Sequence, residues 1–304
     1  MLVIVPRLYR RAGPVLLGLA LAFQLPVDVI LAFIQMWMSS QLGPLPDGVP
    51  RPSVADAQRL LTITGVYVLA AYAVGLLAVV AGAAFVRAGA TTYLHGKASF
   101  RDAAVGALRH APSLVGAAML SGLAILAVVL AGVLAMLLVL AGLAGGTVVS
   151  EGGPAVFLAL VIGVALAVAV VAISVRWSFF APAIVVEAMG AVGSLGRSWR
   201  LTAGNIWRTF GVILMFALLV LLFQVLVTQL LALATDQVFG SGTFGSAVAA
   251  GIGVLVALPF APIVPLAVTV LYFDLRVRQE GSDVAPVQSS PGVPPAPGGP
   301  AAPR

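Results

Sequence analysis

Long apolar runs, separated by short polar stretches, recur along the whole sequence. Six of them exceed the roughly 20 apolar residues that a helix needs to cross the hydrocarbon core of a bilayer. These runs lie at residues 13–38, 60–86, 114–143, 154–181, 206–234 and 244–273. The pattern predicts an all-α, polytopic integral membrane protein with six transmembrane helices.

Composition supports the same class. Hydrophobic residues make up 61% of the chain and charged residues only 9%, whereas a soluble domain carries about 25% charged residues. A water-soluble globule is therefore excluded. The chain has no cysteine, which also excludes disulfides, thiolate metal sites and a cysteine nucleophile.

The positive charges fall on one side of the predicted spans. Fourteen of the 16 Lys and Arg residues precede the first run, follow the sixth, or lie between the second and third or the fourth and fifth. Arg51 and Arg59 lie on the other side. This bias predicts that the N- and C-termini are both cytoplasmic. The net charge of +6 then marks the cytoplasmic side, and we expect no nucleic-acid partner.

The chain start and end call for separate interpretations. A basic start before an apolar run is also typical of a signal peptide. However, no small-x-small cleavage site follows, and the run continues past Pro26 to Trp37, which favours a retained first span. Residues 281–304 are rich in Ser, Pro, Gly and Ala and are predicted to be disordered. We therefore expect a membrane domain at 1–280 and a cytoplasmic tail at 281–304.

Two basic segments between spans resemble each other. "AVGALRH" at 104–110 and "AVGSLGR" at 191–197 each precede a long span. They indicate either a repeated unit of span, basic segment and span, as transporters have, or chance in a chain rich in Ala, Gly and Val. The sequence leaves both interpretations open.

Residues 189–210 have the periodicity of an amphipathic helix. Trp199 falls on an apolar face, and Arg197 and Arg200 fall on a polar face. Such a helix is predicted to lie in the headgroup plane of the membrane. The dipeptide Gly204-Asn205 predicts a break, because glycine suits the residue after a helix and asparagine suits an N-cap.

A shorter segment, 99–111, repeats this arrangement, with Ser99 as its predicted N-cap and with arginines that face water. Together the two segments predict a cytoplasmic surface that binds anionic membrane lipid or a membrane or cytoplasmic protein partner. The alternative is that these arginines only set topology and extend to the headgroups. The candidate residues are Arg197, Trp199, Arg200, Trp207, Arg208, Arg101 and Arg109.

Asp28 is a carboxylate well inside a predicted span, where an acid is a functional candidate by default. It follows Gln24 and Pro26 in "FQLPVDVI". A transporter or lipid-translocating protein could use it as a proton or cation site. The alternative is a first span broken at Pro26, with Asp28 in a wet pocket or paired with Arg59.

The sixth span contains three prolines spaced three residues apart, Pro259, Pro262 and Pro265. Each removes a backbone donor and clashes with the preceding turn. The span is therefore predicted to be kinked or unwound, with freed carbonyl groups that need partners inside the protein. This kinked span and Asp28 would together carry the transporter interpretation.

Catalytic signatures are missing from the sequence. It has no HExxH, no GxSxG and no glycine-rich phosphate loop. His95 and His110 lie 15 residues apart without a third ligand nearby. We expect neither enzyme activity, nor a bound metal, nor a cofactor.

The run from Arg176 to Met215, "RWSFFAPAIVVEAMGAVGSLGRSWRLTAGNIWRTFGVILM", resembles the membrane domain family named after glycerophosphoryl diester phosphodiesterases. Val192 and Gly196 depart from the family pattern. The closing run "LYFDLRVRQEGSD" and the start "RLYRRAGPVLLG" are also similar. The residues that carry the resemblance include Ser198, Trp199, Leu201, Gly204, Asn205, Trp207, Arg208, Tyr272, Asp274, Arg276, Arg278, Glu280 and Gly281.

This resemblance implies a six-helix domain of the bacterial cytoplasmic membrane. It transfers no catalytic residue, because its motifs lie beside the membrane spans and the sequence contains no phosphodiesterase domain. The sequence thus favours a non-enzymatic accessory or scaffold module.

Overall fold

The computed structural model describes residues 4–42, 54–144, 153–240 and 243–281, and nearly all of these residues are helical. Lipid offers no hydrogen-bond partners, so an apolar run must satisfy its backbone within its own helix. The elements are α1 (Ile4–Leu19), the π-helical turn η1 (Ala20–Gln24), α2 (Leu25–Leu42), α3 (Val54–His95), α4 (Phe100–Arg109), α5 (Ala111–Ala144), α6 (Gly153–Arg176), α7 (Phe180–Glu187), α8 (Ala191–Thr202), α9 (Ile206–Phe239), α10 (Thr243–Ala257), the 3₁₀ turn η3 (Leu258–Phe260) and α11 (Ile263–Glu280).

Six helical segments in the described part of the chain are long and apolar enough to cross a membrane. This confirms the all-α class and the predicted number of spans. The segments are Ile4–Met38, Thr62–His95, Ala111–Val139, Phe157–Glu187, Ile206–Phe239 and Ala247–Glu280. The tail predicted at 281–304 lies, except for Gly281, outside the described residues.

Most helices run beyond their predicted ends. The second span was placed at 60–86, whereas α3 covers Val54–His95. The connection expected at 235–243 is mostly helix, because α9 continues to Phe239. An apolar run predicts only the part of a helix that lies in the hydrocarbon core of the membrane. The helix can continue beyond this part because its backbone hydrogen bonds are made within the helix.

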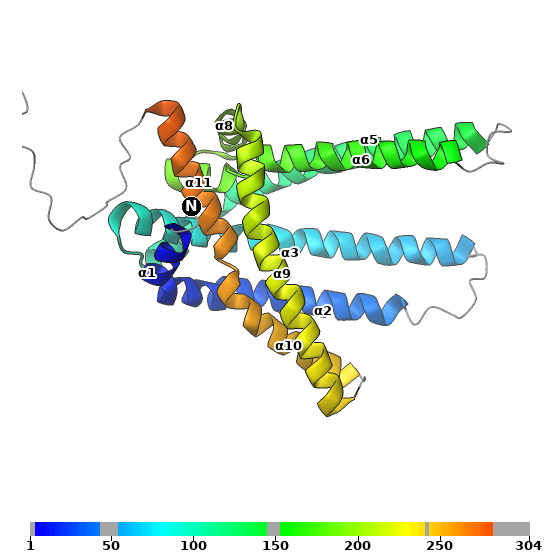
Figure 1. Ribbon diagram of the computed structural model, residues 1–304, viewed down its shortest axis with the longest axis horizontal. Helices are drawn as coiled ribbons and strands as arrows, with labels where there is room; N and C mark the ends of the chain where they lie inside the picture. Colours follow the sequence, from blue (N-terminus) through cyan, green and yellow to red (C-terminus); the bar gives the residue numbers. More distant parts are fainter. Residues whose placement is uncertain (1–3, 43–53, 145–152, 241–242, 282–304) are drawn as a thin grey trace, which may run out of the picture.

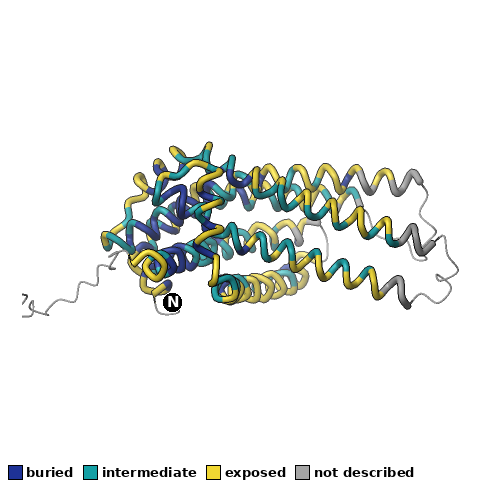
Figure 2. The backbone as a smooth tube through the Cα atoms, turned by 90° about the horizontal axis from the view of Figure 1, so that it is seen from above, coloured by how far each residue is buried: buried dark blue, intermediate teal, exposed yellow. Residues whose placement is uncertain are grey.

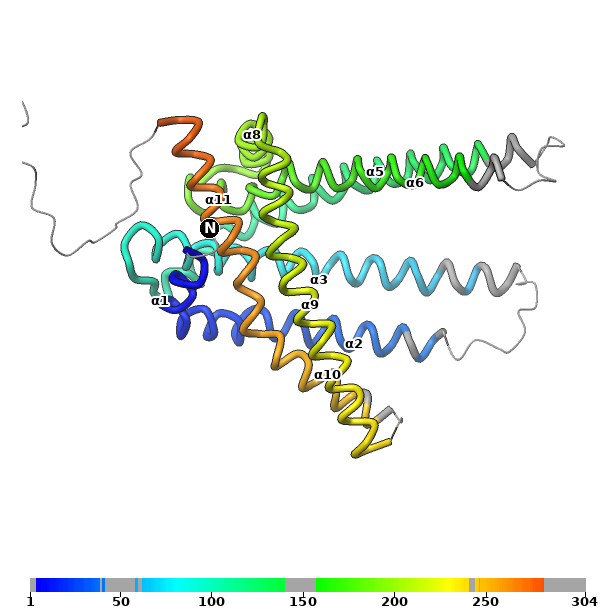
Figure 3. The backbone as a smooth tube through the Cα atoms, viewed as in Figure 1, coloured from blue at the N-terminus to red at the C-terminus, as the bar shows by residue number. Residues whose placement is uncertain are grey.

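The helices meet at one end of the molecule, which we call the charged end. It contains α1, α4, α7, α8 and the C-terminal part of α11, while α2, α3, α5 and α6 project away from it (Figure 1). The hairpin of α9 and α10 crosses α2 and α3 instead of running alongside them (Figure 3). Buried residues gather at the charged end, and the projecting parts of the helices are mostly half-buried or exposed (Figure 2).

Small side chains allow close packing at the charged end. Ala83, Ala84 and Ala88 of α3 are fully buried and pack in one cluster with Leu16 of α1 and Leu114 of α5. In membranes, small residues let helix backbones approach closely, and this favours association where no hydrophobic driving force exists between helices. The charged end therefore holds the tertiary core.

The sixth span is broken as predicted. Helix α10 ends at Ala257, the 3₁₀ turn η3 follows, and α11 begins at Ile263. The Tyr9 hydroxyl donates a hydrogen bond of 2.7 Å to the Pro259 carbonyl. A carbonyl freed by the break thus has the internal partner that an apolar environment requires.

The first span is not broken at Pro26, contrary to one of the expectations above. Its helix continues through η1, where the Leu25 N–H bonds to the Ala20 carbonyl, five residues earlier. Such a π-turn widens the helix locally. The wider turn gives room for the Pro26 ring, which would otherwise clash with the carbonyl four residues before it.

The tyrosine contact can be tested by substitution. Tyr9→Phe removes the donor and leaves the Pro259 carbonyl unpaired, at a cost of about 1–3 kcal/mol in stability. We expect a lower melting temperature in detergent micelles. Tyr67→Phe is the matched control, because the Tyr67 hydroxyl has no hydrogen bond among the described residues. Equal melting temperatures for the two variants would contradict this role of Tyr9.

Candidate functional site

A network of charged side chains joins α7, α8 and α11 at the charged end. Arg197 of α8 donates two hydrogen bonds to Glu187 of α7, from Nε to Oε2 and from Nη2 to Oε1, each 3.1 Å long. Its Nη1 contacts the Glu280 carboxylate of α11. Only 13% of the Arg197 side chain and 12% of the Glu187 side chain are exposed. This is a bidentate pair in a mostly dry setting, where charge-assisted bonds are strong.

Glu187 receives further bonds from α11. The hydroxyl of Tyr272, a fully buried residue, donates to Glu187 Oε1. Nη1 of Arg276 lies 3.6 Å from the same oxygen. The hydrogen bond to Glu280, and to a smaller extent that to Glu187, raises the pKa of Arg197. Arg197 therefore stays charged. The network fixes the relative positions of three helices.

A second ion pair joins α9 to α11. Nη2 of Arg208 lies 2.8 Å from Asp274 Oδ2, and Arg278 Nε lies 3.2 Å from the same oxygen. Arg208 is therefore held by a carboxylate of its own chain. The closing family motif thus supplies partners for the helices before it. Tyr272 and Arg276 contact Glu187 of α7, and Asp274 pairs with Arg208 of α9.

Ser198 connects α8 to the turn between α6 and α7. Its hydroxyl donates to the Arg176 carbonyl at 2.6 Å and accepts from the Phe179 N–H at 3.0 Å. Both backbone groups lie at the break between the two helices, where partners within a helix are missing. The Arg176 guanidinium lies 4.2 Å from the centre of the Trp199 ring, a cation–π distance.

The orientation of α8 differs from the sequence prediction. The face with Ser194, Ser198 and Arg197 packs into the protein, and the face with Val192 and Trp199 is exposed. The prediction that Arg197 lies on an outward cationic face was therefore wrong. The polar face of α8 can turn inward because carboxylates and backbone carbonyls of other helices bind its side chains. A helical wheel does not include partners from other helices.

The break after α8 lies where it was predicted. Helix α8 ends at Thr202, Gly204 has a left-handed φ of +78°, and α9 starts at Ile206. Asn205 stands at the N-cap position without a side-chain capping bond. Its φ of −125° and ψ of 20° are not the extended conformation that the cap needs.

Five of the predicted surface residues are exposed in the structure. Trp199 is 43% exposed and Trp207 is 82% exposed, and Arg101 and Arg109 of α4 are also exposed. Arg200, at the end of α8, is exposed as well. Arg101, Arg109 and Arg200 form no ion pair with any described residue.

Helix α4 is positioned by Arg87 of α3. Arg87 donates to the Val185 carbonyl at 3.2 Å and pairs with Asp102 at 3.3 Å. Its side chain passes so close to α4 that a Cβ on Gly106 would lie 2.9 Å from Arg87 Nε. A larger residue at this position would have to displace the Arg87 side chain. Ser99 occupies the predicted N-cap position of α4, without a side-chain capping bond.

Asp28 has a neutral partner. Gln24 Nε2 donates to Asp28 Oδ1 at 2.8 Å, whereas Nη2 of Arg59, proposed above as a partner, lies 3.4 Å from the Gln41 carbonyl. The carboxylate and its partner are one helical turn apart, so proximity along the helix decided the pairing.

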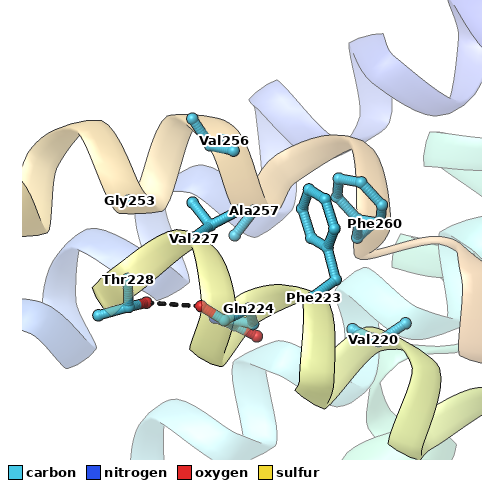
Figure 4. Close-up of a pocket in the computed structure, with 9 residues that line it drawn as sticks. All are labelled: Val220, Phe223, Gln224, Val227, Thr228, Gly253, Val256, Ala257 and Phe260. Atoms are coloured by element: carbon cyan, nitrogen blue, oxygen red, sulfur yellow. Dashed lines mark hydrogen bonds between the residues drawn. The ribbon is translucent and has the colours of Figure 1, made fainter. Parts of the chain in front are cut away.

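Asp28 does not line any of three cavities that described residues form. One, between α9 and α10, measures about 10 Å³ (Figure 4), which is room for about one water molecule. The Phe223 and Phe260 rings stack beside it with centroids 3.8 Å apart. The two larger cavities are an apolar groove between α2 and α10 and a slot between α1, α9 and α11.

His95 and His110 belong to no cluster of possible metal ligands in the part of the chain that the structure describes. Among the residues that the structure describes, no three His, Cys, Asp or Glu side chains gather in a way that could hold a metal ion. His110 Nδ1 lies 2.8 Å from the Gly106 carbonyl.

Glu187 is the central residue that the sequence prediction missed. It follows an apolar run and precedes a cluster of arginines. A carboxylate at the end of a span that has arginines nearby in sequence is the signal that could have identified it.

The buried ion pair gives a stability prediction. Removing one partner of a buried pair leaves the other uncompensated and costs about 3–5 kcal/mol. Arg197→Met should therefore lower the melting temperature strongly. Arg200→Met, three residues further along α8, should change stability by no more than about 0.5 kcal/mol. Similar melting temperatures for both variants would refute the central role of Arg197.

The close approach at Gly106 gives a second prediction. Gly106→Ala has to displace the Arg87 guanidinium from Val185 and Asp102 and should destabilise the protein by about 1–3 kcal/mol. Gly193→Ala in α8, where a Cβ meets nothing within 4 Å, should instead stabilise it by about 0.5–1 kcal/mol. Chemical denaturation in mixed micelles measures both, and stabilisation by Gly106→Ala would contradict the packing described.

Comparison with known proteins relates the second half of the chain to a protein family. Residues 155–285 match the family model described as the membrane domain of glycerophosphoryl diester phosphodiesterase. No curated protein and no solved structure matches the chain. The match covers α7, α8, α9, α10 and α11 with nearly all of α6, and it leaves out the chain start that also resembled the family. The family resemblance is thereby confirmed for residues 155–285, which are similar to the membrane domain of glycerophosphoryl diester phosphodiesterase.

Proposed function

We propose that this membrane protein is a non-enzymatic accessory module that binds anionic lipid through exposed arginines on α4 and α8. The observation that carries the proposal is that Arg101, Arg109 and Arg200 are exposed and lack an ion-pair partner among the described residues. An unpaired guanidinium is free for a phosphate group, which it can bind through two parallel hydrogen bonds.

Exposed apolar side chains accompany these arginines. On α8, Val192 is 74% exposed and Trp199 is 43% exposed, and on α4, Leu108 is 54% exposed. A tryptophan ring with an apolar body and one N–H suits the headgroup region of a bilayer. Arginines next to such side chains are typical of helices that lie at the membrane surface.

Arg197 and Arg208 have no part in this proposal. Carboxylates of α7 and α11 hold both guanidinium groups. A lipid phosphate would have to displace these carboxylates first. Arg197 and Arg208 therefore serve the fold, and the lipid-binding set contracts to Arg101, Arg109 and Arg200 with Trp199 and Trp207.

The orientation in this proposal has both termini in the cytoplasm of a bacterium. Described cations other than Arg59 lie on α1, α4, α8 and α11, in the α3–α4 connection, or on α3, α6 and α9 in contact with these helices. The positive-inside rule assigns such a charged end to the cytoplasm. That side of a membrane presents anionic lipid headgroups, so α4 and α8 would face a surface of opposite charge.

A transporter that uses Asp28 and the broken sixth span stays a prediction without added support. Asp28 has a hydrogen-bond partner in Gln24 and lines none of the three cavities. At the break in the sixth span, the Pro259 carbonyl accepts a hydrogen bond from Tyr9. No observation here favours passage of a substrate over a structural role.

Charge removal on the exposed arginines tests the proposal. Each arginine near an anionic surface contributes about 1 kcal/mol, so Arg101→Gln, Arg109→Gln and Arg200→Gln together should lower retention of phosphatidylglycerol about 100-fold at low salt. Native mass spectrometry after release from nanodiscs measures retention. Raising the ionic strength should weaken binding to the parent protein as well.

The matched control is Arg59→Gln at the opposite end, which should leave retention unchanged. Unchanged retention in the triple variant would refute the lipid proposal. Loss of a co-purifying membrane protein in the triple variant, with lipid retention intact, would instead identify a protein partner for the same surface.

A further inference from the structure

An apolar slot of about 350 Å³ opens where α1, α9 and the start of α11 meet. The surface that lines it is almost entirely hydrocarbon, and Arg10 is the charged residue at its border. The lining includes Tyr9 and Arg10 of α1, Leu219 of α9, Pro259 of η3 and Ile263 of α11.

The slot exists because the sixth span breaks beside it. The chain leaves the helical path at η3 and resumes at Ile263, so no side chain of a continuous helix fills this volume. The Tyr9 hydroxyl bonds to the Pro259 carbonyl and joins two walls of the slot. The Pro259 carbonyl is thereby satisfied, and the surface that remains open to a ligand is apolar.

Arg10 supplies a charge at this apolar volume. It is exposed and forms no ion pair with any residue that the structure describes. Arg7 and Arg11 on the same helix are exposed and unpaired in the same sense, so no carboxylate nearby offsets the positive charge. The site therefore combines a hydrocarbon lining with a free guanidinium, and a ligand that fits it needs an apolar part and an anionic part.

The volume decides between two kinds of occupant. Two turns of a helix from a second copy, about 10 Å across and about 11 Å long, fill more than twice the volume of the slot. An acyl chain is slender enough to enter, and its methylene groups match the apolar lining. The slot also lies within the range of about 300–1,000 Å³ typical of ligand sites.

We propose that this slot holds one acyl chain of an anionic phospholipid whose phosphate group is bound by Arg10. The slot lies on α1, α9 and α11, apart from the α4 and α8 surfaces of the proposed function, and it stands without them. It would hold a single lipid in a defined place, whereas the exposed arginines of α4 and α8 would attract lipid by charge.

Native mass spectrometry of the purified full chain tests this site with phosphatidylglycerol as the probe and phosphatidylcholine as the comparison. Arg10→Gln removes the phosphate ligand, and Leu219→Trp fills the slot from an exposed position. Each should weaken the tightest bound phosphatidylglycerol at least about tenfold. Arg11→Gln is the matched control, since Arg11 is the next residue and does not line the slot, and it should change binding by less than about twofold.

Several results would overturn the site. These are equal weakening by Arg10→Gln and Arg11→Gln, no effect of Leu219→Trp, equal binding of the two lipids, or competition by millimolar inorganic phosphate. A dimer that Leu219→Trp dissociates would identify a second copy as the occupant instead. Unchanged melting temperatures of both variants would show that they fold.

The two lipid proposals fail separately. If the α4 and α8 surfaces do not bind lipid, the triple variant at Arg101, Arg109 and Arg200 keeps its total anionic lipid, while Arg10→Gln still loses the tightest one. If the slot is empty, Arg10→Gln has no effect on that lipid, whatever the triple variant does.

Discussion

The carboxylate of Glu187 lies at the end of a membrane span, where its charge has to be neutralised. The arrangement of the helices at the charged end depends on the groups that neutralise it. Arg197 binds it through two nitrogens, Tyr272 donates its hydroxyl, and Arg276 lies nearby. These groups come from α8 and α11, so neutralising one charge positions three helices. A buried charge costs several kcal/mol unless it is paired with good geometry, which makes this packing specific where apolar contacts alone would be interchangeable.

The projecting helices obey a different constraint. None of the most apolar part of the third span and only 6% of that of the fourth and fifth is buried inside the molecule. Lipid is as apolar as leucine, so these helices gain little by packing together along their length. The tertiary core instead forms at the charged end, through small residues of α3 and through polar bonds to α8 and α11. The proline break in the sixth span adds a local opening, which is where the slot beside Arg10 lies.

Sequence patterns predicted the elements well and their contacts poorly. The six spans, the break at the prolines and the turn at Gly204 could be predicted because each follows from local chemistry: hydropathy, a missing backbone donor, and a left-handed backbone. Arg197, Arg208 and Asp28 were assigned partners or faces that the structure does not show. Arg197 pairs with Glu187 and Glu280, and Arg208 pairs with Asp274. Asp28 bonds to Gln24, one helical turn away. A helical wheel cannot choose among such partners.

The sequence by itself determined the solvent of this protein, the number of its spans and the family resemblance of residues 155–285, because length and polarity of a run are properties of the chain alone. Only the tertiary structure decided which arginines are free. Arg197 and Arg200 are three residues apart on one helix, yet the first is enclosed by two carboxylates and the second is exposed without a described ion pair. The difference arises because α7 and α11 place Glu187 and Glu280 beside Arg197. The order of residues in the sequence does not specify such contacts between helices.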